Sequence, residues 1–170
     1  MRIAITGPES TGKSWLAEEL AKHYNTTWVP EYAREYLTKL NRAYTFDDIL
    51  KIAENQHAQE QNAAKKSDLV FCDTDFCVTS IWCKVKFGKC HDWITDMMQR
   101  KTYSLHLLCN IDLPWQYDPL REHPEMRDEL FQMYVNELSL NNLPYKIISG
   151  AGIQRLNNAI HEIDDFINLR

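Results

Sequence analysis

Five short apolar runs, separated by segments with helical spacing, constrain the fold of this chain more than any other feature. The runs are residues 3–6, 26–29, 69–72, 105–109 and 145–148. Runs that are apolar throughout, without an alternating polar face, are typical of strands buried on both sides. Parallel strands need helical crossovers, and the intervening segments supply them. We therefore predict an α/β fold, with a doubly wound, five-stranded parallel sheet flanked by helices on both faces.

The segments between the runs predict six helices. They cover residues 16–24, 31–40, a long stretch after Thr45, about 76–87, about 124–140 and 156–167. Thr45 is a candidate N-cap, and the long helix after it becomes polar in its second half. No repeat, low-complexity tract or linker marks a second domain, so residues 1–170 are expected to form a single domain.

Composition and charge narrow the class of protein. Of the 170 residues, 44% are hydrophobic and 25% charged, the net charge is −5, and the lysines and arginines are scattered. We therefore expect a globular protein with no nucleic-acid partner. No apolar stretch reaches membrane-spanning length and the N-terminus resembles a strand, so a cytoplasmic protein without membrane contact is expected. The number of cysteines is odd and no CxxC pair occurs, which predicts reduced thiols at Cys72, Cys77, Cys83, Cys90 and Cys109.

A glycine-rich motif lies between the first strand and the first helix. Its sequence, Gly7-Pro8-Glu9-Ser10-Thr11-Gly12-Lys13-Ser14, matches the phosphate-binding loop GxxxxGK[ST] in the context that the motif requires. Backbone N–H groups of such a loop and the helix N-terminus bind a polyphosphate. Lys13 should reach the β- and γ-phosphates of ATP, and the Ser14 hydroxyl should coordinate Mg²⁺. The predicted nucleotide-binding residues are Gly7, Glu9, Ser10, Thr11, Gly12, Lys13, Ser14 and Trp15. The alternative is a glycine-rich turn with an exposed lysine.

Charged residues at the ends of two other strands are candidates for catalysis, because ligands of open parallel sheets bind at the carboxyl ends of the strands. Asp73 and Asp75 follow the third strand. Asp73 is expected to hold Mg²⁺ or to act as the general base, and Asp75 to contact the acceptor or take its proton. Helix capping is the alternative for either residue. Glu31 and Arg34, after the second strand, are expected to face the cleft, with Glu31 as a further candidate base; a surface ion pair between them is the alternative.

The polar stretch 118–127 is interpreted as a lid that carries Arg121 and Arg127. Arginines on a closing segment neutralise charge on a transferring phosphoryl group, although solvated arginines would look the same in sequence. Gln56 and Trp82 are the remaining candidates for acceptor binding. Trp82 offers a ring for stacking and Gln56 an amide for hydrogen bonding, and a core position is the alternative for Trp82.

Five segments together resemble the NadR-type ribosylnicotinamide kinase domain. That domain is an AAA-like ATPase domain of the P-loop NTPase superfamily. They are residues 7–14, Val29-Pro30-Glu31-Tyr32-Ala33-Arg34, Ile52-Ala53 with Gln56, Phe71-Cys72-Asp73-Thr74-Asp75 and Asp118-Pro119-Leu120-Arg121. The resemblance covers nearly the whole chain. It implies transfer of the γ-phosphate of ATP to the ribose 5′-hydroxyl of nicotinamide riboside, giving nicotinamide mononucleotide for NAD salvage.

Carried over by position, the resemblance implies ATP and Mg²⁺ binding by Lys13 and Ser14, a metal or base role for Asp73, and a lid role for Arg121. Trp15 departs from the threonine that is common after the loop. The adenylyltransferase domain and DNA-binding segment of larger members find no counterpart, so the expected product is the mononucleotide.

Two other functions remain open at this stage. A kinase of different specificity, such as a thymidylate-kinase-like enzyme, would share the loop, the aspartates and the lid. An ATPase switch would use the same loop to drive a conformational change. The sequence also leaves open the oligomeric state, a homodimer included, and whether Glu31, Asp73 or Asp75 is the base.

Overall fold

Hydrogen bonding joins the five apolar runs into one sheet in the computed structural model, which describes residues 1–169. The strands are β1 (Arg2–Thr6), β2 (Thr27–Val29), β3 (Val70–Asp73), β4 (Leu105–Cys109) and β5 (Tyr145–Ile148). Their order is β2-β3-β1-β4-β5, and all four neighbouring pairs are parallel. The predicted α/β class and five-stranded parallel sheet are therefore confirmed.

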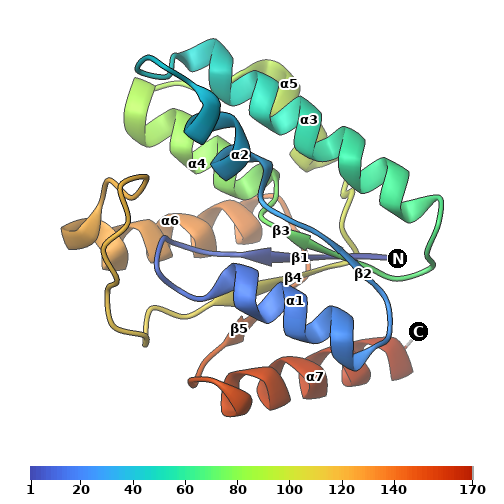
Figure 1. The fold of residues 1–170 in the computed structure, drawn as a ribbon. Coiled ribbons are helices and arrows are strands. Elements are labelled where there is room, and N and C mark those ends of the chain that lie inside the picture. The colour runs from blue at the N-terminus through green and yellow to red at the C-terminus, as the bar shows by residue number, and fades with distance from the viewer. Residues whose placement is uncertain (170) are drawn as a thin grey trace.

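Helices cover both faces of the sheet (Figure 1). They are α1 (Lys13–His23), α2 (Tyr32–Lys39), α3 (Phe46–Ala64), α4 (Phe76–Phe87), α5 (Asp92–Gln99), α6 (Arg127–Leu140) and α7 (Ile153–Asn168), with a 3₁₀ turn η1 (Pro124–Met126) before α6. One hydrophobic core lies between the sheet and α1 and α7, and the other lies between the sheet and α3, α4, α5 and α6. This double covering explains why β1, β3 and β4 are almost entirely apolar and buried.

Helix α5 was not among the predicted helices. It has only eight residues, and its buried side chains are Ile94, Met97 and Met98. A helix of two turns is marginal on its own, so α5 depends on packing against α4 rather than on local propensity. No helix among residues 1–169 combines the length and the apolar character needed to cross a bilayer. All five cysteines have free thiols in this structure.

The polar second half of α3 encloses a buried carboxyl group. Glu60 is fully buried, and the Tyr103 hydroxyl donates to its Oε2 at 2.9 Å. Gln56 Nε2 donates to Glu60 Oε1 at 3.2 Å, and Arg2 Nη1 lies 3.8 Å from Oε2. Burial dominates and raises the pKa of Glu60 to about 7. The polar composition of this helix therefore reflects an internal network as well as a solvated face.

The raised pKa of Glu60 predicts a pH-dependent stability. Between its ordinary pKa of 4.5 and about 7, the folded chain retains a proton that the unfolded chain releases, so stability falls as pH rises through this window. Relative to Glu60→Gln, the free energy of unfolding of the native chain is expected to fall by at most about 3 kcal/mol between about pH 5 and about pH 8. Urea denaturation at several pH values measures the difference, and parallel curves for the two proteins would contradict it.

Candidate active site

The loop between β1 and α1 is shaped by three residues with positive φ. Gly7, Ser10 and Gly12 have φ of 130°, 58° and 77°. A Cβ atom at Gly7 would lie 2.9 Å from the carbonyl oxygen of Cys109, so β4 passes too close for any other residue. Gly12 is the N-cap of α1 and provides no capping side chain, which leaves the first N–H groups of the helix available to an anion.

Lys13 lies folded back across this loop. Its Nζ donates to the carbonyl oxygens of Gly7 at 2.9 Å and Pro8 at 2.8 Å. The Thr11 hydroxyl also donates to Pro8, at 2.8 Å. These bonds hold the ammonium group at the mouth of the loop, where a phosphate oxygen can replace a carbonyl as its acceptor.

Arg155 of α7 stabilises the loop through a hydrogen bond to its backbone. The side chain is fully buried; it donates to the carbonyl oxygens of Thr11, Gly150 (2.7 Å) and Asn110 (3.2 Å), and pairs with the Asp112 carboxylate. A buried guanidinium group is tolerated only when its donors are matched in this way.

Sequence analysis missed Arg155. A signal was present, because an arginine four residues before Ala159 and eight before Ile163 lies on the core-facing side of a helix.

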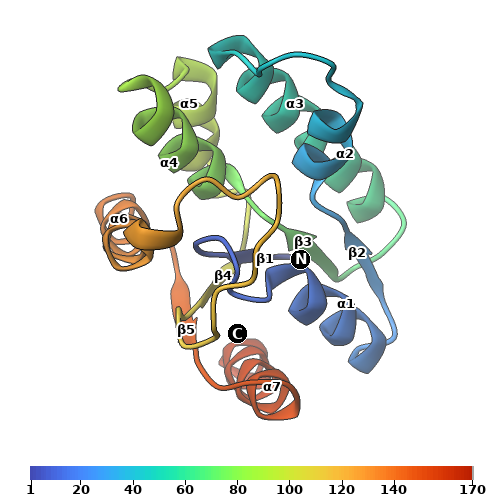
Figure 2. The ribbon, with the colours of Figure 1, turned by 60° about the vertical axis from the view of Figure 1, so that its left-hand side comes forward.

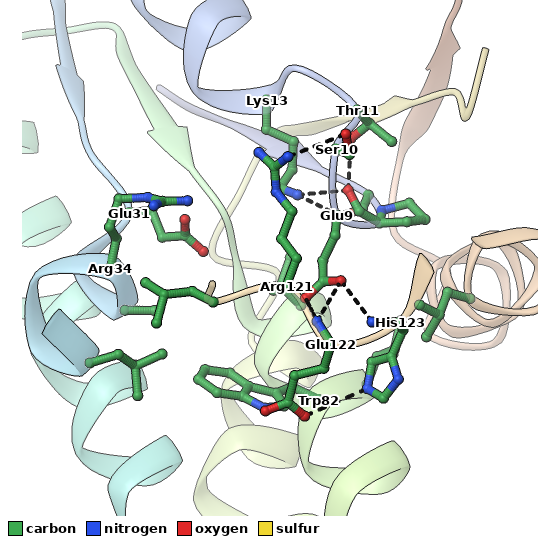
Figure 3. Close-up of a pocket in the computed structure, with 18 of the residues that line it drawn as sticks. Glu9, Ser10, Thr11, Lys13, Glu31, Arg34, Trp82, Arg121, Glu122 and His123 are labelled. Atoms are coloured by element: carbon green, nitrogen blue, oxygen red, sulfur yellow. Dashed lines mark hydrogen bonds and ion pairs between the residues drawn. The ribbon is translucent and has the colours of Figure 1, made fainter. Parts of the chain in front are cut away.

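A cavity of about 660 Å³ opens beside the loop. Figure 3 shows Glu9, Ser10 and Lys13 facing it from the loop, with Glu31 and Arg34 across from them and Trp82 at its base. Among the predicted site residues, its lining includes Gly7, Glu9, Ser10, Thr11, Gly12, Lys13, Ser14, Trp15, Glu31, Arg34, Trp82 and Arg121. Gln56, Asp73, Asp75 and Arg127 lie outside this lining.

The cavity has two chemically different ends. Near the loop it is polar, with Lys13 and Arg121 as well as the carboxylates of Glu9 and Glu31. Away from the loop its walls are aromatic and aliphatic, and they include Leu37, Leu40, Tyr44, Ile81, Trp82 and Val85. Trp82 Nε1 donates to the Tyr44 hydroxyl at 3.0 Å, and the two rings are 5.1 Å apart at 66°. A ligand that combines an aromatic ring with a phosphate-accepting group matches this division.

Asp73 lies directly behind the loop, at the end of β3. The residue is 1% exposed, and its Oδ1 has no hydrogen-bond partner among residues 1–169. Burial, followed by the charge of Glu31, raises the pKa of Asp73 to about 6, whereas the Ser14 hydroxyl and Lys13 act in the opposite direction. A buried carboxylate oxygen without a partner, next to a serine hydroxyl, fits a hard cation such as Mg²⁺.

The residues described in the structure do not provide a full set of protein ligands for a metal beside Asp73 and Ser14. Among the described residues, no group of three or more His, Cys, Asp or Glu side chains is placed to hold an ion. Mg²⁺ commonly uses one or two protein ligands, with phosphate and water oxygens completing its octahedron. Ser14 and Asp73 are consistent with such a site.

Asp75 has a structural position in this fold. Its Oδ1 accepts hydrogen bonds from the Val78 N–H at 2.9 Å and the Thr6 hydroxyl at 3.0 Å, and its Oδ2 lies 3.6 Å from His106 Nε2. The carboxylate therefore caps α4, which was the alternative interpretation, and lies outside the lining of the large cavity. Asp75 does line a smaller pocket that shares Glu31 and Trp82 with the large cavity, so its contact with an acceptor stays a prediction.

Gln56 also faces inward rather than toward the large cavity. It is 6% exposed; its Oε1 accepts from the Tyr32 N–H at 2.9 Å and its Nε2 donates to the Asp73 carbonyl at 3.3 Å. The amide thus joins the start of α2 to the end of β3. It is placed to position Glu31 and Asp73. Gln56 also lines the smaller pocket that shares Glu31 and Trp82 with the large cavity, so direct contact with the acceptor stays a prediction.

The segment predicted as a lid crosses the mouth of the loop (Figure 2). Both of its arginines converge on Ser10: Arg121 Nη1 lies 3.3 Å from Ser10 Oγ, and Arg127 Nη2 lies 3.4 Å from the Ser10 carbonyl oxygen. Arg127 is the first residue of α6 and also donates to Leu113 O at 2.9 Å. Arg34 pairs with Asp118 at 2.9 Å, rather than with Glu31, and so ties α2 to the lid.

Comparisons with known proteins identify the family of this chain. Residues 2–155 match the family model described as an AAA domain. The trifunctional NAD biosynthesis/regulator protein NadR of Escherichia coli (strain K12) is 34% identical over 151 residues, which are 84% of this chain and 37% of NadR. This chain therefore spans well under half the length of that relative.

Solved structures share the fold. A crystal structure of NadR protein in complex with NR has a TM-score of 0.78 at 23% identity, covering 99% of this chain and 50% of that one. Deoxyadenosine kinase from M. mycoides with the products dCMP and dCDP has a TM-score of 0.69 at 15% identity, covering 97% of this chain and 100% of that one. The chain therefore belongs to the AAA-domain family of P-loop proteins and is a homologue of the part of NadR that it matches.

Proposed function

We propose that this chain is an ATP- and Mg²⁺-dependent kinase that phosphorylates the ribose 5′-hydroxyl of nicotinamide riboside and forms nicotinamide mononucleotide. The observation that carries the proposal is one cavity that joins a phosphate-binding loop to an aromatic wall. Its volume of about 660 Å³ is within the range of small-molecule sites. The presence of NR in the related NadR crystal supports this acceptor.

In the proposed reaction, the acceptor hydroxyl oxygen attacks the γ-phosphorus of ATP, the bond to the β-phosphate oxygen breaks, and ADP leaves. Lys13 stabilises charge on the β- and γ-phosphates, while Ser14 and Asp73 hold Mg²⁺. Arg121 contacts the transferring phosphoryl group from the lid, and Arg127 fixes the loop beneath it.

We assign the proton-accepting role to Glu31. Glu31 lines the cavity, whereas Asp73 and Asp75 are outside its lining and are buried. A general base must reach the proton that it removes, so position takes precedence over pKa here.

The test is ADP release from ATP and Mg²⁺ with nicotinamide riboside, with no acceptor, and with a panel of ordinary nucleosides. Release that depends on nicotinamide riboside is the expected result. Release that depends on another nucleoside would keep the mechanism and replace the acceptor, as in a thymidylate-kinase-like enzyme. Acceptor-independent release would instead favour the ATPase switch.

The buried anchor of the loop predicts a selective effect on ATP. Arg155→Lys is expected to raise KM for ATP about tenfold, because one ammonium group with three N–H donors cannot replace a guanidinium group that donates to the carbonyl oxygens of Thr11, Gly150 and Asn110 and to the Asp112 carboxylate. KM for the acceptor should change little, since Arg155 does not line the cavity. Steady-state kinetics with each substrate varied in turn measures the split, and equal increases in both KM values would contradict it.

A further inference from the structure

Glu122, within the lid segment 118–127, contacts both sides of the cavity. Its backbone N–H lies 3.2 Å from the Glu9 carboxylate oxygens of the phosphate-binding loop. Its own carboxylate accepts hydrogen bonds from the Tyr44 hydroxyl at 2.9 Å and from Lys86 Nζ at 2.7 Å. One lid residue therefore bridges the loop and the opposite wall, and Figure 3 shows it between Glu9 and Trp82.

The partners of Glu122 belong to the aromatic end of the cavity. Tyr44 and Lys86 both line it, and the Tyr44 hydroxyl also accepts from Trp82 Nε1 at 3.0 Å. Lys86 Nζ lies 5.4 Å from the centre of the Tyr44 ring. Burial alone would raise the pKa of Glu122, but hydrogen bonds from Lys86 and Tyr44 hold it below its ordinary value. The carboxylate is therefore charged at neutral pH, and it pairs with the wall against which an acceptor ring would pack.

The neighbouring lid residue faces the phosphate-binding loop. Arg121 Nη1 lies 3.3 Å from Ser10 Oγ, and Arg121 precedes Glu122 directly in the chain. Because the two residues share one rigid peptide unit, a shift of the lid backbone that moves Glu122 relative to Tyr44 also moves Arg121 relative to the loop. A continuous path of contacts thus runs from the aromatic wall through Glu122 to the nucleotide end.

We infer that Glu122 is a positioning residue that couples occupancy of the aromatic end of the cavity to the placement of Arg121 over the nucleotide phosphates. The inference rests on the proposed function. An acceptor ring packed on Tyr44 and Trp82 fixes the hydroxyl from which Glu122 accepts, and so stabilises the closed lid. A nucleotide that contacts Arg121 stabilises the same closed lid, so each ligand increases affinity for the other by the same factor.

The test measures this factor directly. Isothermal titration gives the affinity of the native chain for nicotinamide riboside with and without a saturating non-hydrolysable ATP analogue. We expect the analogue to increase that affinity about tenfold in the native chain and to leave it nearly unchanged in Glu122→Ala. Affinity of Glu122→Ala for the analogue alone should stay close to native. A general loss of structure would weaken the binding of nicotinamide riboside both with and without the analogue, and would leave the ratio of these two affinities unchanged.

Two further variants sharpen the experiment. Tyr44→Phe keeps the ring and removes the hydroxyl, so its coupling factor should lie between those of the native chain and Glu122→Ala. Glu125→Ala, at an exposed position on η1 in the same lid segment, should keep the native factor.

The outcomes separate this inference from the proposed function. A native factor in Glu122→Ala, or a factor near one in the native chain, overturns the coupling but leaves the kinase proposal standing. If nicotinamide riboside does not bind to the native chain, the proposed acceptor is wrong. The coupling through Glu122, which depends on that acceptor, is then overturned as well.

Discussion

Replacing Lys13 by alanine is expected to lower kcat/KM for nicotinamide-riboside-dependent ADP release by about a thousandfold. The ammonium group already lies at the mouth of the phosphate-binding loop, 2.9 and 2.8 Å from two loop carbonyl oxygens. Without it, the charge that develops on the β- and γ-phosphates during transfer has no cation from the loop. Coupled-enzyme kinetics of the purified variant gives the measurement.

The fold should tolerate this change. Lys13 is only partly buried, and the loop keeps its anchors through Thr11 and Arg155. A thermal melt close to that of the native chain is therefore expected. Lys22→Ala is the matched control, because Lys22 lies in the same helix but pairs on the surface with Glu18 and Glu19. Near-native turnover by Lys13→Ala would remove Lys13 from the proposed mechanism.

The fold was largely predictable because its signals are local. Continuous apolar runs mark strands buried on both faces, and the glycine pattern of residues 7–14 fixes the position of one loop between a strand and a helix. The long helices repeat an apolar face over several turns, which makes their period easy to detect. Helix α5 has only two turns and depends on α4, so its existence is decided by packing.

The site was predictable only where neighbouring residues form it. Residues 7–14 act as one continuous segment, and their place in the cavity follows from the motif. Glu122 and Tyr44, by contrast, are separated by 78 positions along the chain, and their hydrogen bond depends on how the lid crosses the phosphate-binding loop. Arg155 and Thr11 are 144 positions apart. Pairs of this kind have no spacing signal in a single sequence.

Carboxylates at strand ends illustrate the same limit. Sequence position did not decide which of Glu31, Asp73 and Asp75 is the base, because each follows a strand that ends at the same edge of the sheet. The structure separates them by burial and by contact. Asp75 caps a helix, Asp73 is buried behind the loop, and Glu31 lines the cavity. The Gln56 amide joins the Tyr32 N–H, next to Glu31, to the Asp73 carbonyl oxygen. This role could not be inferred from the presence of an amide side chain alone.

Substituting Asp73 by asparagine is expected to lower kcat about a hundredfold and to raise the Mg²⁺ concentration for half-maximal activity about tenfold. The Asp73 side chain has a buried oxygen without a partner beside Ser14, so the amide keeps the shape of the site and removes the charge that attracts the cation. Glu31→Gln is the contrasting variant. It should lower kcat by about two orders of magnitude and change the Mg²⁺ requirement much less than Asp73→Asn does, because it removes the proton acceptor and acts on Asp73 only through the loss of a neighbouring charge.

Titrating Mg²⁺ at saturating ATP and acceptor distinguishes these two carboxylates. A much larger shift of the Mg²⁺ midpoint in Asp73→Asn than in Glu31→Gln assigns the metal to Asp73 and the proton to Glu31. Full Mg²⁺-dependent activity in Asp73→Asn would show that the buried carboxylate serves neither purpose. A larger midpoint shift in Glu31→Gln would instead assign the metal to Glu31. That residue is half-buried and lines the cavity, where water can complete the coordination of the ion.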